Sequence, residues 1–412
     1  MELAFSRTLG LDDAKAFLAR ALSAGKFPHA LLIHGPEGMG QNALILDLID
    51  LLLCEDAARR PCGRCAGCLG RKRDNLDNLH FVLPLAEKSD PGDPRALTQA
   101  QVGELSEGIA SLSADPYGFV PAEKAVIRIA QVADLQGKIS FSLAGGRAKA
   151  AAMLKVETMD APVANALLKT LEEPPPDTYF LLACEDRGAL LPTIVSRCTQ
   201  LPLFPMSADG LRAAAASRAT AWEMPAVPER LLPFAEGAPG VLLALHRDGG
   251  EALLAEAGRF FAAAFDAEAV SGNGLAFADY LEASPAFEDL ASAARLLAFQ
   301  LRVVRLALRL RTGRPPVGPG PIGTWTRAAL RAEGLDAGLA ETLAPLEAAA
   351  DLRGLAEWLE ELLAAVRGYA KPKNAAYGLY LEYIQKHPPG AASASADATA
   401  ARAQAPSARK EP

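Results

Sequence analysis

The sequence predicts an α/β domain followed by an all-α region, and three observations lead to this prediction. In residues 1–206, short apolar runs alternate with helical patterns, as they do in α/β domains. From residue 207 to about residue 387 the strand signals fade and helical periodicity dominates. A length of 412 residues suggests two or three domains at about 150 residues each.

Four apolar runs in the first region predict strands: Ala30–Ile33, His80–Leu83, Ala150–Met153 and Tyr179–Ala183. Helical patterns separate them, so we expect a parallel sheet whose ligands would lie at the carboxyl ends of the strands. The first run leads into a turn at Gly35, and a helix is expected from Ala43 to Leu53.

Composition limits the function classes. Half of the residues are hydrophobic and 22% are charged, which excludes intrinsic disorder for most of the chain. Apolar runs are interrupted before the roughly 20 residues of a membrane span, and no signal peptide is expected around Glu2 and Arg7. With 42 basic and 49 acidic side chains, we expect any DNA contact to be local or shared with partners.

The segment from Gly35 to Asn42 has the glycine spacing of a P-loop, G-x-x-x-x-G-K-[ST], with glycines at 35, 38 and 40. A P-loop lysine carries a positive charge to the β and γ phosphates, but position 41 is the neutral Gln41. The hydroxyl that would bind Mg²⁺ is replaced by Asn42. We interpret Gly35, Gly38, Gly40, Gln41 and Asn42 as a degenerate nucleotide site. Weak binding without hydrolysis, or a glycine turn never related to nucleotides, are the alternatives.

The acidic residues that hold the metal of an NTPase are also missing. They would follow the strand at 150–153, where the chain has Leu154 and Lys155. Without the cation, the hydroxyl and the acid, the chain has no means of stabilising the transition state of hydrolysis. We therefore expect no ATP hydrolysis by this chain.

Four of the six cysteines lie close together, at Cys54, Cys62, Cys65 and Cys68. The spacing C-x7-C-x2-C-x2-C is typical of a tetrahedral zinc site in a reducing cytoplasm, and four thiolates leave no open position for catalysis. We predict structural zinc; free thiols or disulfides are the alternatives. The adjacent run Arg71–Arg73 is basic enough to contact a phosphate backbone, although such short runs are usually only solvated.

The residues downstream resemble a known family. The segment Asn165–Pro175 predicts a helix that ends before its prolines, and Leu190–Ile194 and Ser196-Arg197-Cys198 follow it. Together with the cysteine module after the P-loop helix, these motifs resemble the clamp-loader subunits of bacterial DNA polymerase III, which are AAA+ proteins. The degenerate P-loop and Leu154-Lys155 resemble the delta-prime branch rather than the γ/τ motor.

The resemblance implies a role for Arg197: in clamp loaders the arginine of the Ser-Arg-Cys motif, here with Ser196 and Cys198, reaches into the ATP site of a neighbouring motor subunit. A permanently charged guanidinium suits a γ-phosphate. The family's two sensor positions match Cys184 and Val241, which further weakens nucleotide chemistry in this chain.

The resemblance also implies the organisation and partners of the chain. We expect an AAA+ domain at 1–206 with the zinc module at 54–68, a small helical lid at 207–248, a helical collar for oligomerisation at 249–387 and a disordered Ala-, Ser- and Pro-rich tail at 388–412. The implied partners are the γ/τ motor and delta subunits, with the sliding clamp and primed DNA reached through the complex. An active γ/τ-type ATPase, or a zinc-dependent DNA-binding protein on an inactive AAA+ scaffold, are the rival hypotheses.

Overall fold

The computed structural model describes residues 2–56, 58–72, 77–86, 88, 93–122, 124–141, 148–222, 227–265, 275–312, 346, 352–368 and 371–386. The chain divides into two compact units, which we call the α/β unit (1–227 with 235–245) and the helical unit (228–234 with 246–412). The expected tail at 388–412 lies outside the described residues. The stretch 207–248, expected as a lid, divides between the two units.

A sheet of five parallel strands, in the order β4-β5-β6-β2-β7, forms the centre of the α/β unit. Its strands are β2 (Ala30–His34), β4 (Leu79–Val82), β5 (Lys149–Met153), β6 (Thr178–Cys184) and β7 (Thr199–Pro202). Leu32 of β2 lies opposite Leu182 of β6 and Gln200 of β7. The four expected strands and the α/β plus all-α fold class are confirmed. Strand β7 was not predicted, because Leu201 is its only buried residue.

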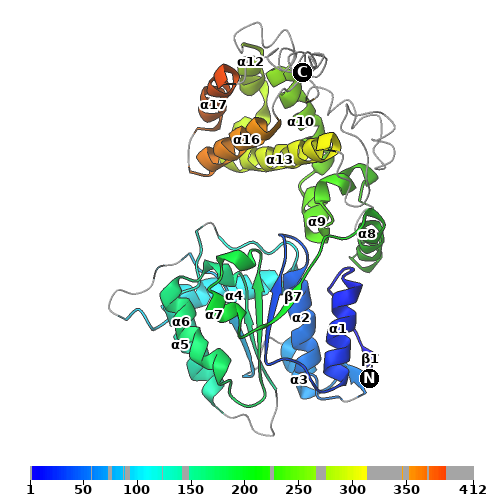
Figure 1. Ribbon diagram of the computed structural model, residues 1–412, viewed down its shortest axis with the longest axis vertical. Helices are drawn as coiled ribbons and strands as arrows, with labels where there is room; N and C mark the ends of the chain where they lie inside the picture. Colours follow the sequence, from blue (N-terminus) through cyan, green and yellow to red (C-terminus); the bar gives the residue numbers. More distant parts are fainter. Residues whose placement is uncertain are drawn as a thin grey trace, which may run out of the picture. The chain divides into compact units, whose positions relative to one another are not determined.

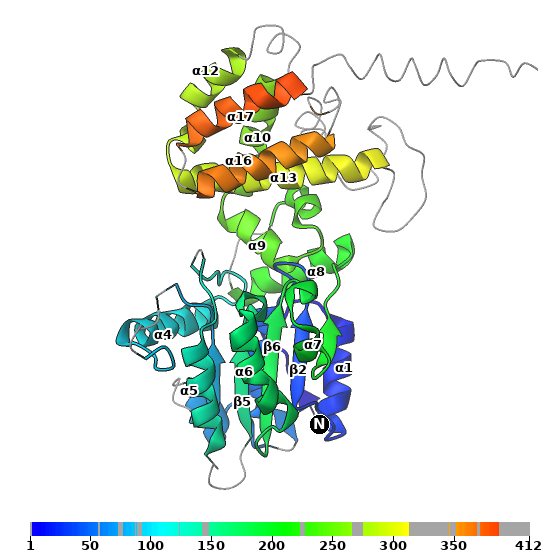
Figure 2. The ribbon, with the colours of Figure 1, turned by 60° about the vertical axis from the view of Figure 1, so that its left-hand side comes forward.

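Helices cover both faces of this sheet, with α5 and α6 on one side and α1 and α2 on the other (Figures 1 and 2). A small parallel pair, β1 (Glu2–Leu3) and β3 (Arg59–Arg60), lies apart from it. The helices of this unit are α1 (Asp12–Ser23), α2 (Gln41–Leu52), α3 (Ala66–Lys72), α4 (Gln99–Ala114), α5 (Ile129–Ser140), α6 (Ala161–Glu172), α7 (Pro192–Val195), α8 (Ala208–Trp222) and most of α9 (Pro239–Arg247).

Helix α6 shows how local sequence sets the element bounds. The Asp160 side chain accepts a hydrogen bond from the backbone N–H of Val163 and so caps the first turn. The helix ends at Glu172, in agreement with the expectation that it stops before Pro174. Its apolar face, which includes Leu167 and Leu171, is buried in the main hydrophobic core beside the sheet.

The helical unit contains α10 (Gly250–Phe265), α12 (Leu275–Ala283), α13 (Leu290–Thr312), α16 (Leu352–Arg367) and α17 (Pro372–Lys386). Figure 2 shows α13 and α16 side by side. An aromatic cluster fills the core, with ring centroids 5.1 Å apart for Phe260 and Phe277 and 5.9 Å apart for Phe260 and Trp358. None of the described helices has both the length and the hydropathy that a bilayer crossing requires.

Candidate functional sites

The glycine loop joins the central strand β2 to helix α2, so the strand–loop–helix setting of a P-loop is present. Gly38 and Gly40 have φ angles of 76° and 98°, which side chains other than glycine rarely adopt. Helix α2 begins at Gln41, two residues before the expected start. The glycines at 38 and 40 therefore stand where the backbone requires them.

Residues from distant parts of the chain pack against this loop. The backbone N–H of Gly240 donates to the carbonyl of Gly38 at 2.8 Å, and a Cβ added at Gly38 would lie 2.8 Å from Cγ2 of Val241. A Cβ added at Gly40 would lie 3.0 Å from the hydroxyl of Tyr117. An aliphatic side chain, Val241, thus packs on the loop at the position expected to match the family's second sensor.

The two residues that replace the phosphate-binding pair hydrogen-bond to the protein itself. The Gln41 Nε2 donates to the carbonyls of Gly35 at 2.6 Å and Pro36 at 3.0 Å, and the residue is only 8% exposed. The Asn42 Nδ2 donates to the carbonyl of Pro116 at 3.3 Å. Both amides thus stabilise the loop and its neighbours.

At the carboxyl end of β5, Leu154 is fully buried and Lys155 forms an ion pair with Glu185. Glu157, which sequence reasoning did not single out, lies nearby, and its Oε1 accepts a 3.0 Å hydrogen bond from the backbone N–H of Glu185. Burial raises the pKa of Glu157 above its usual range. Burial also raises the pKa of Cys184 to about 12, so this residue, expected to match the family's first sensor, is a neutral core thiol.

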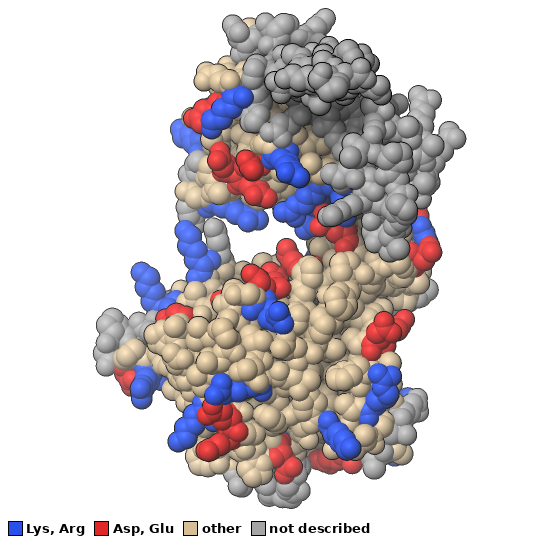
Figure 3. All heavy atoms as spheres, viewed as in Figure 1, with Lys and Arg blue, Asp and Glu red and all other residues tan. Residues whose placement is uncertain are grey.

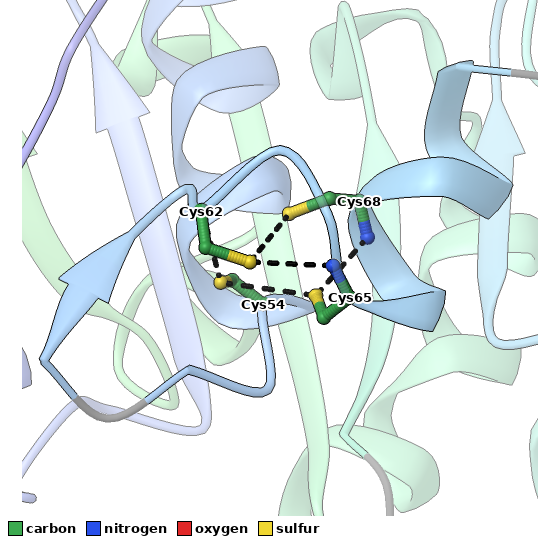
Figure 4. A group of neighbouring side chains, drawn as sticks. All are labelled: Cys54, Cys62, Cys65 and Cys68. Atoms are coloured by element: carbon green, nitrogen blue, oxygen red, sulfur yellow. Dashed lines mark hydrogen bonds between the residues drawn. The ribbon is translucent and has the colours of Figure 1, made fainter.

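The four cysteines of the expected zinc module meet in space, and Figure 4 shows their sulfur atoms pointing toward one another. All four Sγ atoms lie within 4.8 Å of one another. Cys54 follows α2, Cys62 follows β3, and Cys65 and Cys68 lie at the start of α3. A short β-strand and two helices therefore hold the four ligand candidates.

This arrangement fits a tetrahedral zinc ion. Thiolates about 2.3 Å from zinc lie roughly 3.8 Å from one another, and the Cys62–Cys68 and Cys54–Cys65 sulfur pairs are each 4.0 Å apart. Backbone N–H groups point at the sulfurs, as from Cys65 to the Sγ of Cys62 at 3.3 Å. A backbone hydrogen bond from Arg64 is the main cause that lowers the pKa of Cys62 to about 6, whereas burial raises the pKa of Cys68 to about 12.

Arg71, the first residue of the basic run after the cysteines, is buried inside the α/β unit. Its Nε lies 3.5 Å from the Asp50 carboxylate, and its Nη2 lies 3.4 Å from the Ser113 hydroxyl. The suggested phosphate contact is therefore wrong for this residue; Arg73 lies outside the described residues. On the face seen in Figure 3, acidic and basic side chains of the α/β unit are interspersed among uncharged residues.

The Ser196-Arg197-Cys198 motif directly follows α7. The Arg197 Nε donates to Glu172 Oε1 at 2.7 Å, its Nη2 also contacts that oxygen, and its Nη1 donates to the carbonyl of Thr193 at 2.8 Å. The Ser196 hydroxyl donates to the same carbonyl at 3.2 Å. Cys198 is buried, which raises its pKa to about 11. The arginine side chain is 30% exposed.

The parallel sheet, the glycine loop after its central strand and the surrounding helices define an α/β domain of the P-loop type, whose loop lacks the P-loop lysine and hydroxyl. Residues 10–207 match the family described as DNA polymerase III, delta subunit. The DNA polymerase III subunit delta′ of Pseudomonas aeruginosa is 33% identical over 230 residues, which are 54% of this chain and 56% of that protein. The Escherichia coli subunit delta′ is 30% identical over 190 residues, 46% of each chain. Residues 10–207 of the α/β unit are thus similar to the delta and delta′ subunits of bacterial DNA polymerase III.

The chain is also similar to a tau subunit of DNA polymerase III. The Escherichia coli subunit tau is 28% identical over 209 residues, 50% of this chain and 26% of that protein. The chain spans about half the length of the curated delta′ relatives that it matches. A solved DNA polymerase III gamma subunit-related protein from Thermotoga maritima is 12% identical, with a TM-score of 0.39 over 89% of this chain and 99% of that one. A TM-score this low adds nothing to what the sequence relatives show.

Proposed function

We propose that this chain is a non-hydrolysing delta-prime subunit of a clamp loader. The observation that carries the proposal is Gln41, whose amide takes the place of the phosphate-binding lysine and donates into its own loop. Asn42, Leu154 and Lys155 remove the remaining metal ligands, and Val241 and Tyr117 pack on the loop glycines. The same substitutions and contacts argue against the rival γ/τ-type motor.

In this proposal the chain acts on a neighbour's ATP site. Arg197 is the finger: it is partly exposed, it follows a short helix and its guanidinium is permanently charged. A finger supplied in trans accelerates hydrolysis by roughly 10³–10⁵. The Ser196 hydroxyl donates to the carbonyl of Thr193, to which Arg197 also donates. Cys198 packs in the hydrophobic core beside the sheet.

The proposed partners are the γ/τ motor and delta subunits, bound through the helical collar at 249–387, in a cytoplasmic complex that loads the sliding clamp on primed DNA. Zinc held by Cys54, Cys62, Cys65 and Cys68 would have a structural role, linking α2, β3 and α3. The buried ion pair of Arg71 is one reason to prefer this assignment over a zinc-dependent DNA-binding protein.

The test is reconstitution of the full chain with its cognate motor subunit, delta subunit and clamp. We expect the chain alone to release no phosphate from ATP and Mg²⁺, and Arg197→Ala to slow the DNA-stimulated hydrolysis of the complex. Arg212→Ala, which changes a half-exposed arginine paired with Asp209 within α8, is the matched control. An unchanged rate with Arg197→Ala would refute the finger, and failure to co-assemble would refute the assignment.

A further inference from the structure

We propose that Glu172 is a positioning residue for Arg197, holding the guanidinium in the orientation in which it can meet a phosphate of the neighbouring subunit. This inference rests on the proposed function, because Glu172 would orient the guanidinium that the proposed function assigns to catalysis in trans. Glu172 is the last residue of α6, and Arg197 follows α7, 25 residues later in the chain. The Nε and Nη2 atoms of Arg197 both contact one carboxylate oxygen, Oε1 of Glu172.

The two backbones that carry this pair are fixed in the same hydrophobic core. Leu171, directly before Glu172, is buried in the cluster that also contains Ile194 and Cys198, which lie on either side of Arg197. Both side chains therefore start from anchored Cα positions. Surface ion pairs usually lose much of their strength to the entropy of two freely moving side chains, and this loss is smaller where both backbones are packed.

The hydrogen-bond inventory of Arg197 leaves donors for a ligand. A guanidinium has five N–H groups. One on Nε and one on Nη2 point to Glu172, and one on Nη1 points to Thr193. One N–H on each Nη atom has no acceptor within the part of the chain that the structure describes. Glu172 thus binds one edge of the guanidinium, and two donors remain for a planar, bidentate contact with phosphate.

The position of Glu172 also distinguishes it from its neighbour. Glu173 is the C-cap residue of α6, and no contact of its carboxylate with Arg197 is present in the described structure. The two acids are adjacent and both carry one negative charge. If Glu172→Ala and Glu173→Ala differ in hydrolysis rate, the cause is therefore the contact with Arg197 and not the loss of one negative charge from this surface.

The experiment measures kcat and KM for DNA-stimulated ATP hydrolysis by the reconstituted complex. A misplacement of about 1 Å at a reacting centre can cost roughly 10²-fold, so we expect Glu172→Ala to lower kcat by about 10-fold with little change in KM for ATP. Glu172→Gln, which keeps an acceptor oxygen, should recover part of the rate. Glu173→Ala should match the wild type. Glu172→Ala combined with Arg197→Ala should be no slower than Arg197→Ala alone.

Three results would overturn the inference. If Arg197→Ala slows the complex but Glu172→Ala does not, Arg197 needs no positioning by Glu172, and the proposed function stands without it. A Glu172→Ala complex faster than the wild type would mean that the contact restrains the finger. If Arg197→Ala leaves the rate unchanged, the finger and its positioning both fail. Thermal unfolding of each variant chain checks that folding is preserved.

Discussion

The amide of Gln41 donates a 2.6 Å hydrogen bond to the carbonyl of Gly35, six residues earlier, so the side chain at the phosphate-binding position is turned into its own loop. A lysine there would present its ammonium to a phosphate. The neutral amide instead donates to the loop's own carbonyls and presents no positive charge to a phosphate. This contact is the structural basis of the proposal that the chain does not hydrolyse ATP.

Restoring the two P-loop residues should not restore catalysis. We expect the double substitution Gln41→Lys and Asn42→Thr to leave ATP hydrolysis by the isolated chain at background, because Leu154 and Lys155 still provide no metal-binding acid. Phosphate release measured with ATP and Mg²⁺ checks this. Steady turnover by the double variant would show that the loop alone was limiting.

Gly38→Ala should destabilise the α/β unit by about 1–3 kcal/mol, because alanine is strained at positive φ. The new Cβ would also lie 2.8 Å from Cγ2 of Val241. Gly103→Ala in α4 is the control: no atom lies within 4 Å of its added Cβ, and alanine favours a helix by about 1 kcal/mol over glycine. Urea unfolding of both variants measures the difference. Equal stabilities would contradict the close packing at Gly38.

The purified chain should carry about one zinc ion, and Cys62→Ala should abolish it, because a structural site needs all four thiolates. Cys184→Ala should retain the metal, since Cys184 is a core thiol outside the cluster. Elemental analysis gives the zinc content of each variant. Removal of zinc by a chelator should lower the unfolding temperature. A Cys62→Ala chain with full zinc content would argue against the four-cysteine site.

Gln300 on α13 is fully buried, and neither its Nε2 nor its Oε1 has a hydrogen-bond partner among the residues that the structure describes. Gln300→Met keeps a similar shape and removes the unsatisfied amide, so we expect a gain of about 1 kcal/mol. Gln131→Met should instead lose about 1–3 kcal/mol, because the buried Gln131 donates to Leu83 at 2.7 Å and accepts from Arg128 at 2.9 Å. Denaturant unfolding should give Gln300→Met a higher free energy of unfolding than the wild type and Gln131→Met a lower one.

The helical unit should lose stability in acid through Glu256. Burial opposes ionisation of this carboxyl, but the hydroxyls of Ser284 and Tyr280 and the guanidinium of Arg259 outweigh it and lower its pKa below 4.5. A carboxyl whose pKa is lower in the folded state stabilises that state above its unfolded pKa. This stabilisation is lost as the pH falls from about 4.5 through the lowered value. Glu256→Gln should show a shallower loss between pH 5 and 3; unfolding followed by circular dichroism tests it.

Much of the fold could be predicted because its signals are local. Apolar runs of strand length located β2, β4, β5 and β6, and the proline pair predicted the end of α6. Strand β7 and helix α5 gave no signal strong enough to place them. The C-x2-C-x2-C spacing brought together residues that are neighbours in the chain, so the cysteine cluster could also be predicted.

The amino-acid sequence by itself determined which side chains the P-loop pattern lacks: Gln41, Asn42, Leu154 and Lys155 supply no P-loop lysine, hydroxyl or acid. Only the tertiary structure decided what replaces that chemistry. The Tyr117 side chain, which no sequence motif marks, packs on Gly40, and its hydroxyl accepts a hydrogen bond from the backbone N–H of Leu9, 108 residues away. Glu172 meets Arg197 because two helix ends are anchored in one core. Such contacts depend on packing across many residues, and no local pattern encodes them.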